Sequence, residues 1–227
     1  MPEDRRIRYQ QGDHFCALYR TPEEQLTIAA DYIRAGLERG ERCFYICGEH
    51  SVGEFREGLQ RSGIAVEFEE ARGALLLSSK DETYLEAGKF DPERMLLLLT
   101  RAVQDALDAG FTGLCSGGDM TWILDDVPGS YRLPEYEARL NEFSRSQKAI
   151  ILCLYNRISL PIDVVDHSIA THCRIHLEGP ILLENPFLEP DHHAMFRRAH
   201  RAEIVSEKIE ILEATGAALF ANSTLSL

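Results

Sequence analysis

The chain has 227 residues, of which 44% are hydrophobic and 27% charged, a composition typical of a soluble globular domain. It carries 24 Lys and Arg against 37 Asp and Glu, a net charge of −13. This balance excludes a nucleic-acid surface that spans the whole chain, because a phosphate backbone needs a basic surface, although a local basic patch stays open. The length favours one domain of roughly 180–200 residues with an appendage.

The cysteines and the N-terminus indicate the compartment. Five of the six cysteines lie in or beside apolar runs, which is typical of buried thiols rather than of a disulfide framework. Residues 1–14 are charged and hold no apolar signal-peptide core. No apolar run reaches the ~18 residues of a membrane-spanning helix. We therefore expect a reduced, cytoplasmic protein with no membrane contact.

Strand-like and helix-like patterns alternate along the chain. Thr21-Pro22 and Asp91-Pro92 each place a capping side chain before a proline, which predicts two helix starts. The expected strands span 14–20, 42–47, 74–78, 112–117, 149–155, 174–179 and 181–185. The expected helices span 22–39, 52–59, 92–108, 133–146 and 161–170. Such alternation predicts βαβ units in a three-layer α/β fold, with a mostly parallel sheet covered by helices on both faces.

Residues 189–227 are expected to form a linker and a C-terminal amphipathic helix. Prolines in 185–193 favour the linker. An apolar seam with steps of three and four follows, at Ala202, Val205, Ile209, Leu212, Gly216 and Leu219. Two alternatives remain open: the helix packs on its own domain, or residues 195–220 form a homodimer or signal-relay helix.

The turn after the first strand cannot hold a triphosphate in the usual way. A phosphate loop needs glycines, a lysine and free backbone amides, and the turn Arg20-Thr21-Pro22-Glu23-Glu24 has neither Gly nor Lys. Pro22 lacks an N–H, and the two glutamates place negative charge where a phosphate would lie. The G-x-G-x-x-G and G-x-S-x-G patterns are absent too. We expect no enzymatic activity and assign no catalytic residue.

The histidines and cysteines predict no metal site by their spacing. His167, His172 and His176 are 5 and 4 residues apart, but a strand pattern at 174–177 prevents a shared helical face. The pair His192-His193 is better explained as a solvated helix cap. His14 and Cys16 share one face of the first strand, either as a packed buried pair or as ligand-contacting residues.

Polar and aromatic residues follow several predicted strands at their carboxyl ends, where open α/β sheets bind ligands. Tyr19 ends the first strand, Gly48-Glu49-His50 follows the second, Gly118–Trp122 the fourth and Tyr155-Asn156-Arg157 the fifth. An aromatic pocket with a few polar groups suits a small organic ligand. Core packing is the alternative for Trp122.

Over residues 12–188 the chain resembles the MEDS family, the methanogen/methylotroph sensory domain. The resemblance lies in the order of the segments HFCALYRTPEEQL, ERCFYICGE, GLCSGGDMTWIL, LPEYEARLNEF and LCLYNR. This resemblance implies a RecA-like layout with a degenerate Walker A loop. It also implies a sensor of small hydrocarbon-like molecules, fused or adjacent to histidine kinases and DNA-binding regulators. The family's motif positions fall on His14, Cys16, Asp119, Trp122, Glu137, Asn141 and Tyr155. Asp119 stands where relatives often carry Glu.

These observations predict a sensory domain at 12–188 that binds a small, largely apolar ligand and signals to a protein partner, without a cofactor, a metal or direct nucleic-acid contact. The predicted ligand-binding residues are His14, Cys16, Tyr19, Glu49, Asp119, Met120, Trp122, Glu137, Asn141 and Tyr155. Three alternatives stay open. They are a divergent nucleotide enzyme using Asp119 and Glu137 for Mg²⁺, a metal- or haem-binding redox sensor using His14, Cys16 or other cysteines and histidines, and a partner-binding module without a ligand.

Overall fold

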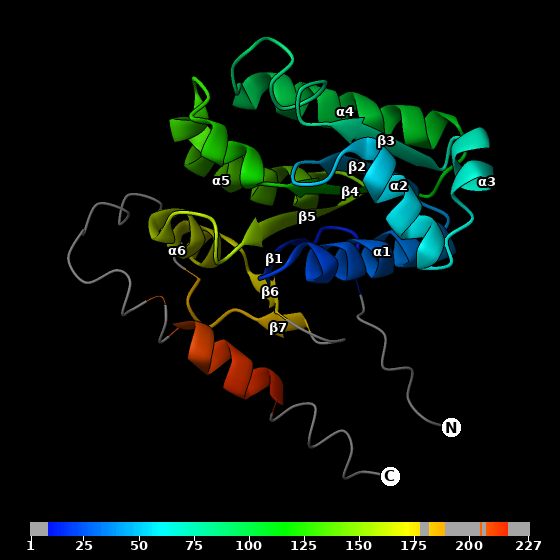
Figure 1. Ribbon diagram of the computed structural model, residues 1–227. Coiled ribbons are helices and arrows are strands. Elements are labelled where there is room, and N and C mark those ends of the chain that lie inside the picture. The colour runs from blue at the N-terminus through cyan, green and yellow to red at the C-terminus, as the bar shows by residue number, and fades with distance from the viewer. Residues whose placement is uncertain (1–8, 178–181, 189–204, 206–207, 218–227) are drawn as a thin grey trace, which may run out of the picture.

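The computed structural model describes residues 9–177, 182–188, 205 and 208–217, and within them a single sheet lies between two layers of helices (Figure 1). The strands are β1 (His14–Tyr19), β2 (Arg42–Cys47), β3 (Leu75–Ser79), β4 (Leu114–Asp119), β5 (Ala149–Asn156), β6 (Arg174–His176) and β7 (Leu182–Glu184). The helices are α1 (Pro22–Glu38), α2 (Val52–Arg61), α3 (Val66–Ala71), α4 (Pro92–Asp108), α5 (Leu133–Ser146) and α6 (Ile162–Thr171), with 3₁₀ turns η1 (Thr121–Asp125) and η2 (Ser130–Arg132).

The predicted elements are present, with shifted ends. The strand predicted at 112–117 lies at 114–119, so its carboxyl end is Asp119 itself. The strand predicted at 174–179 ends at His176, and residues 178–181 lie outside the described part. The helix α3 was not predicted, because no capping side chain marks the start of these six residues.

The sheet has the strand order β3-β2-β4-β5-β1-β6-β7. All neighbouring pairs are parallel except β6 and β7. The carboxyl ends of β1, β2, β4 and β5 therefore meet at one edge of the sheet, where ligands of open α/β sheets bind.

Alternate residues of each strand face opposite helical layers. Cys16 and Leu18 of β1 belong to the core beneath α4, α5 and α6, whereas Phe15, Ala17 and Tyr19 belong to the core with α1, α2 and α3. Strands β1, β4 and β5 are buried at every position, as expected for strands covered on both faces. Figure 1 shows α1 and α4 on opposite sides of the sheet.

The two helix starts predicted from capping residues are present. The Thr21 side chain accepts a hydrogen bond from the Glu24 amide at the start of α1. The Asp91 carboxylate accepts from two amides of the first turn of α4. These bonds satisfy amides that have no partner inside the helix, which explains why α1 and α4 begin where they do.

The described part of the C-terminal segment packs on its own domain. Val205 and Leu212 are buried in the core beneath α4–α6. Lys208 Nζ lies 2.7 Å from an Asp166 carboxylate oxygen of α6, and Arg157 lies 2.7 Å from Glu213. Residues 208–217 of this segment are helical, and in Figure 1 this helix runs beside β7. The predicted linker after residue 188, His192-His193, Ala202 and Leu219 lie outside the described residues, and the homodimer stays a prediction.

Candidate functional site

The predicted site residues fall into groups on the two faces of the sheet. Tyr19, Glu49 and Asp119 meet at the carboxyl edge on the α1 side. Met120 and Trp122 lie in the core on the α4 side. The remaining five, also on that side, lie between the sheet, α5 and α6; they are Glu137 and four residues around it, His14, Cys16, Asn141 and Tyr155.

Asp119 ties together the ends of three strands. Its oxygens accept hydrogen bonds from the Glu49 amide at 3.1 Å and the Thr121 amide at 2.9 Å. The Tyr19 hydroxyl lies 3.2 Å from both Asp119 oxygens and 3.1 Å from Glu49 Oε2, and its one hydrogen serves one of them. Burial raises the pKa of Asp119, while the two amide hydrogen bonds oppose that rise. The chain's own donors therefore occupy this carboxylate.

The turn between β1 and α1 holds a carboxylate of the chain itself. The Arg20 amide donates to Glu24 Oε2 at 2.8 Å, and Arg20 Nε donates to Glu24 Oε1 at 3.2 Å. The Glu24 amide in turn donates to Thr21 Oγ1 at 3.2 Å. Helix N-termini in this position bind phosphate through such amides. Here those amides are engaged by side chains of the same turn.

Trp122 packs inside an aromatic cluster at the carboxyl edge. Its ring centroid lies 5.3 Å from that of Tyr84 and 4.6 Å from that of Phe90, which contacts Tyr136 edge to face. Both Trp122 and Met120 are fully buried. Trp122 Nε1 meets no hydrogen-bond acceptor among the described residues. The cluster thus has an apolar body and one unused donor.

A buried ionic cluster surrounds Glu137 of α5. Glu137 Oε2 lies 3.1 Å from His14 Nε2 and 3.1 Å from His172 Nε2. Cys153 Sγ of β5 lies 3.5 Å from the same His14 nitrogen. The other carboxylate oxygen, Oε1, accepts a 2.7 Å hydrogen bond from the Tyr155 hydroxyl. Four residues, His14, Glu137, Cys153 and His172, each offer one ligand atom here. These four atoms all lie within 4.8 Å of one another, and all four residues are buried.

The outer ring nitrogens of both histidines are held by oxygen atoms. His172 Nδ1 lies 2.7 Å from the Ser168 carbonyl oxygen, which only accepts, so Nδ1 carries the hydrogen. His14 Nδ1 lies 3.1 Å from Asn141 Oδ1. The Asn141 amide nitrogen donates to the Thr171 carbonyl at 2.9 Å, which fixes its oxygen toward His14. In the neutral rings, both Nε2 atoms are therefore acceptors that face the cluster; the Cys153 thiol can donate to His14 Nε2, whereas His172 Nε2 has no hydrogen-bond partner among the described residues.

The electrostatics of the cluster reflect its burial. Burial alone would raise the pKa of Glu137, but His172 and His14 hold that pKa well below its usual range. Burial and the neighbouring His172 lower the pKa of His14. Burial also acts to lower the pKa of His172, but Cys16 and Glu137 outweigh it and raise that pKa. Burial and the Glu137 charge raise the pKa of Cys153 to about 12.

Neither Cys153 nor His172 was among the predicted site residues. Cys153 sits in an apolar run, and His172 follows α6. A partial signal existed for Cys153, since it shares a strand face with Tyr155 and pairs in register with Cys16. Cys16 itself points its sulfur to the Ser168 carbonyl, 3.8 Å away, and its thiol is not one of the four converging ligand atoms.

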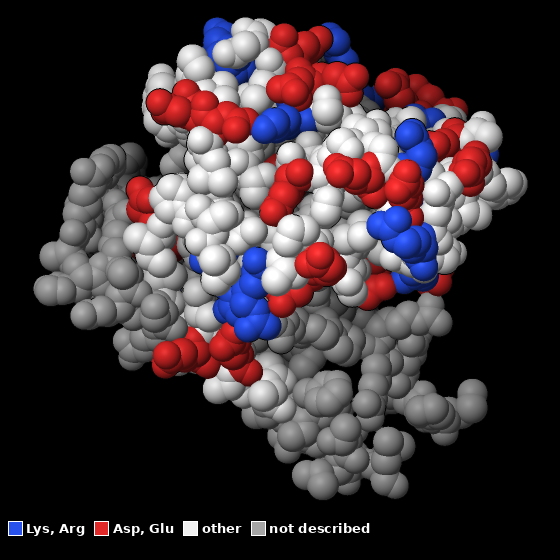
Figure 2. Space-filling model, viewed as in Figure 1, with Lys and Arg blue, Asp and Glu red and all other residues white. Residues whose placement is uncertain are grey.

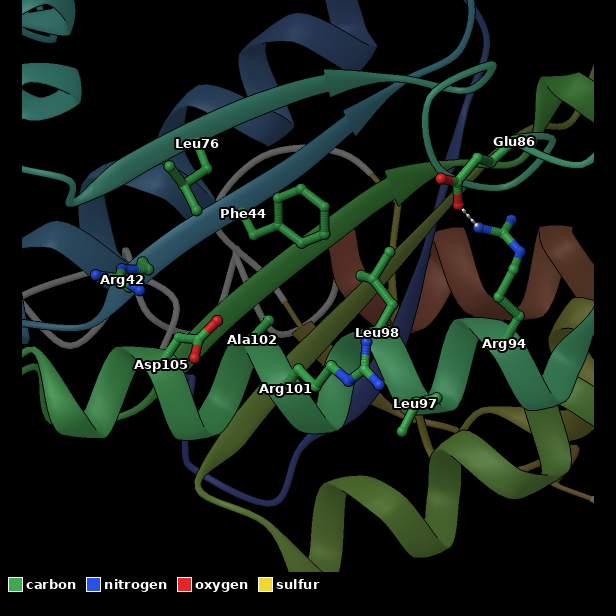
Figure 3. A pocket seen from close by; sticks show the side chains of 10 residues that line it. All are labelled: Arg42, Phe44, Leu76, Glu86, Arg94, Leu97, Leu98, Arg101, Ala102 and Asp105. Carbon is green, nitrogen blue, oxygen red and sulfur yellow. Dashed lines mark hydrogen bonds and ion pairs between the residues drawn. The ribbon is translucent and has the colours of Figure 1, made fainter.

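An open groove of about 320 Å³ lies elsewhere, between α4 and the β2–β3 edge (Figure 3). Its apolar floor includes Phe44 and Leu76, and charged side chains line its rim, among them the Arg94–Glu86 ion pair at 2.6 Å. None of the predicted site residues lines it. On the face shown in Figure 2, basic and acidic side chains are interspersed and form no continuous basic surface among the described residues.

Comparison with solved structures defines the class of fold. A KaiC-like protein from Pyrococcus horikoshii is 14% identical with a TM-score of 0.51, over 74% of this chain and 72% of the other. The flagellar accessory protein FlaH from Methanocaldococcus jannaschii is 14% identical with a TM-score of 0.54, over 76% of this chain and 75% of the other. Together with the sheet order, these similarities show a three-layer RecA-like α/β fold.

The family follows from the sequence match. The family described as MEDS, the MEthanogen/methylotroph, DcmR Sensory domain, matches residues 13–173, and the chain belongs to it. The resemblance noted in the sequence analysis is thereby confirmed, and with it a sensory role in outline. No curated protein matches the chain. Among the described helices, none combines the length and the apolar character needed to cross a membrane.

Proposed function

We propose that this chain is a sensory domain that binds a small, largely apolar molecule at the carboxyl edge of its sheet and signals to a partner protein, such as a histidine kinase or a transcription regulator, without nucleotide turnover. The observation that carries the proposal is the turn after β1. There the Arg20 amide and side chain bind Glu24, a carboxylate of the chain itself. The sensory family description supports the same conclusion.

The turn argues against a phosphate ligand on charge and on hydrogen bonding. A bound phosphate would meet the Glu24 carboxylate at close range, and like charges repel. Pro22 offers no amide hydrogen at the first position of α1. Displacing Glu24 would also unpair the Arg20 amide from its present acceptor. The fold keeps the position of a phosphate loop, but two carboxylates, those of Glu23 and Glu24, stand there against the one positive charge of Arg20.

The aromatic cluster around Trp122 supports a small apolar ligand. Tyr84, Phe90 and Tyr136 supply an apolar surface, and the buried Trp122 Nε1 has no acceptor among the described residues. An unpaired buried donor costs about 1–3 kcal/mol, which a ligand with one acceptor atom would recover. The matching chemistry is a compact apolar body with a single oxygen or halogen acceptor.

The C-terminal segment offers a route for the output. It contacts α6 through Lys208 and Asp166, and the loop after β5 through Arg157 and Glu213. A ligand shifts such contacts only if it binds two conformations with different affinity. A ligand at the carboxyl edge that moves the loop after β5 would change how the C-terminal segment packs on the domain. The surface available to a partner protein would change with it.

Trp122 is the only tryptophan of the chain, so its fluorescence reports on the proposed site without background from other tryptophans. The full chain would be titrated with short ketones, aldehydes, ethers and haloalkanes, with melting temperature followed in parallel. We expect a saturable emission change and a rise in melting temperature for a subset of them. The variant Trp122→Phe, which lacks the indole donor, should lose most of the thermal shift.

ATP or GTP with Mg²⁺ serves as the opposing ligand in the same assay. If only nucleotides raise the melting temperature, the proposal is wrong. Nucleotide hydrolysis that disappears in Asp119→Asn would support the divergent enzyme instead. The variant Glu24→Gln provides a check on the mechanism, since removal of its charge should improve any residual nucleotide binding while leaving the response to apolar ligands unchanged.

A further inference from the structure

We propose that His14, Glu137, Cys153 and His172 form a buried binding site for one divalent transition-metal ion, with Zn²⁺ the best fit. This inference does not rest on the ligand proposal, because the metal cluster and the Trp122 cluster use different side chains. Two nitrogens, one oxygen and one sulfur make up its donor set. Such sets suit tetrahedral Zn²⁺.

Three of the six separations between the ligand atoms are close to those around a tetrahedral ion, and the other three are no longer than 4.8 Å. Bond lengths of about 2.0–2.3 Å place nitrogen and oxygen ligands about 3.3 Å apart, and nitrogen and sulfur about 3.6 Å apart. The carboxylate oxygen of Glu137 lies 3.1 Å from each histidine Nε2, and Cys153 Sγ lies 3.5 Å from His14 Nε2. A small adjustment of the side chains would centre an ion among them.

The hydrogen bonding around the cluster calls for a cation at its centre. Glu137 Oε2 and His172 Nε2 are buried and, despite their 3.1 Å separation, make no hydrogen bond of acceptable geometry with any described group. Because the Ser168 carbonyl holds the hydrogen on His172 Nδ1, the neutral ring turns a lone pair toward Glu137. Asn141 orients His14 in the same way. Converging lone pairs in a dry core repel one another unless a cation lies between them.

The supporting contacts are those of a metal site. Each histidine presents Nε2 to the centre and holds Nδ1 against an oxygen, the arrangement that fixes the tautomer of metal-bound histidines. The Tyr155 hydroxyl engages Glu137 Oε1 and leaves Oε2 for the ion. When the ion binds, Cys153 gives up its thiol proton to solvent and the metal–sulfur bond forms. A divalent ion then balances one carboxylate and one thiolate, so the buried site is neutral.

A proton on His172 is the competing explanation. It would pair with Glu137, but His14 Nε2, whose one donor is the Cys153 thiol at 3.5 Å, would still lie 3.1 Å from the same carboxylate oxygen. The metal satisfies both histidines at once. Because all four ligands are buried, the site is closed to substrate, as in structural zinc sites. It would join β1, α5 and β5 to the residue that follows α6.

The test uses the full chain, unfolded in denaturant with a chelator and refolded with one equivalent of Co²⁺. We expect tetrahedral Co²⁺ absorption with a thiolate charge-transfer band, both displaced by Zn²⁺, and about one metal ion retained per chain after gel filtration. The charge-transfer band should vanish in Cys153→Ser. It should persist in Cys115→Ser, the same substitution at a buried cysteine on the other face of the sheet.

Two further measurements cover the case in which Cys153→Ser fails to fold. X-ray absorption at the zinc edge of the wild-type chain should show one sulfur and three lighter ligands. The variant Asn141→Ala, which alters no ligand, should weaken metal affinity about ten- to a hundredfold. The proposal is overturned if the refolded wild type has native circular dichroism but retains no metal, if the spectrum shows no sulfur ligand, or if the band survives in a folded Cys153→Ser.

Discussion

The substitution Glu137→Gln tests how much the buried cluster contributes to stability. Gln keeps the shape of Glu but removes the charge that faces His14 and His172 at 3.1 Å each. Glu137 is 0% exposed, so water cannot replace the lost interaction. Breaking a buried ion pair from one side costs about 3–5 kcal/mol, and the positive partner of Glu137 is either a bound metal ion or a protonated His172. For a chain of this length that corresponds to a drop in melting temperature of about 6–20 °C.

The assay is thermal and urea unfolding of the full chain, with Glu135→Gln as the matched control. Glu135 lies on the same helix, but it is exposed and its ion pairs with Arg132 and Arg139 are screened by solvent, so its variant should change stability little. A second variant, His172→Gln, completes a double-mutant cycle with Glu137→Gln and should show strong coupling. A Glu137→Gln loss no larger than that of the control would refute the reasoning.

Other substitutions test the fold at single contacts. Asp91→Ala removes the cap that accepts from two amides of α4 and should lower the free energy of unfolding by about 0.5–2 kcal/mol, measured in urea; an unchanged midpoint would contradict the cap. In Gly118→Ala the added methyl group would overlap the Tyr84 hydroxyl, so we expect a loss of about 1–3 kcal/mol by the same measurement. Leu212→Ala should lower the free energy of unfolding by about 2–5 kcal/mol and speed proteolysis of the C-terminal segment, because Leu212 is buried. Ile211→Ala, at an exposed neighbour, should do neither. Equal effects of the two substitutions would show that Leu212 does not pack on the domain.

The local features of this protein follow from its sequence because they depend on residues close together in the chain. Thr21 and Asp91 start helices through hydrogen bonds within one turn. The lack of a phosphate-binding loop depends on the side chains that directly follow β1. Glu24 lies in the turn where its negative charge was predicted to oppose a phosphate. The alternation of strands and helices is also a pattern of neighbouring residues, and it predicted the parallel sheet. The short helix α3 was missed because no side chain marks its start.

Only the tertiary structure decided which distant residues meet. His14, Glu137, Cys153 and His172 come from β1, α5, β5 and the end of α6, and no spacing in the sequence relates them. They converge because β1 pairs directly with β5. The side chains of His14 and Cys153 also point to the same face of the sheet, the one that α5 and α6 cover. The choice between core and ligand for a residue such as Trp122 likewise depends on which side chains surround it, and those come from segments that the sheet order brings together.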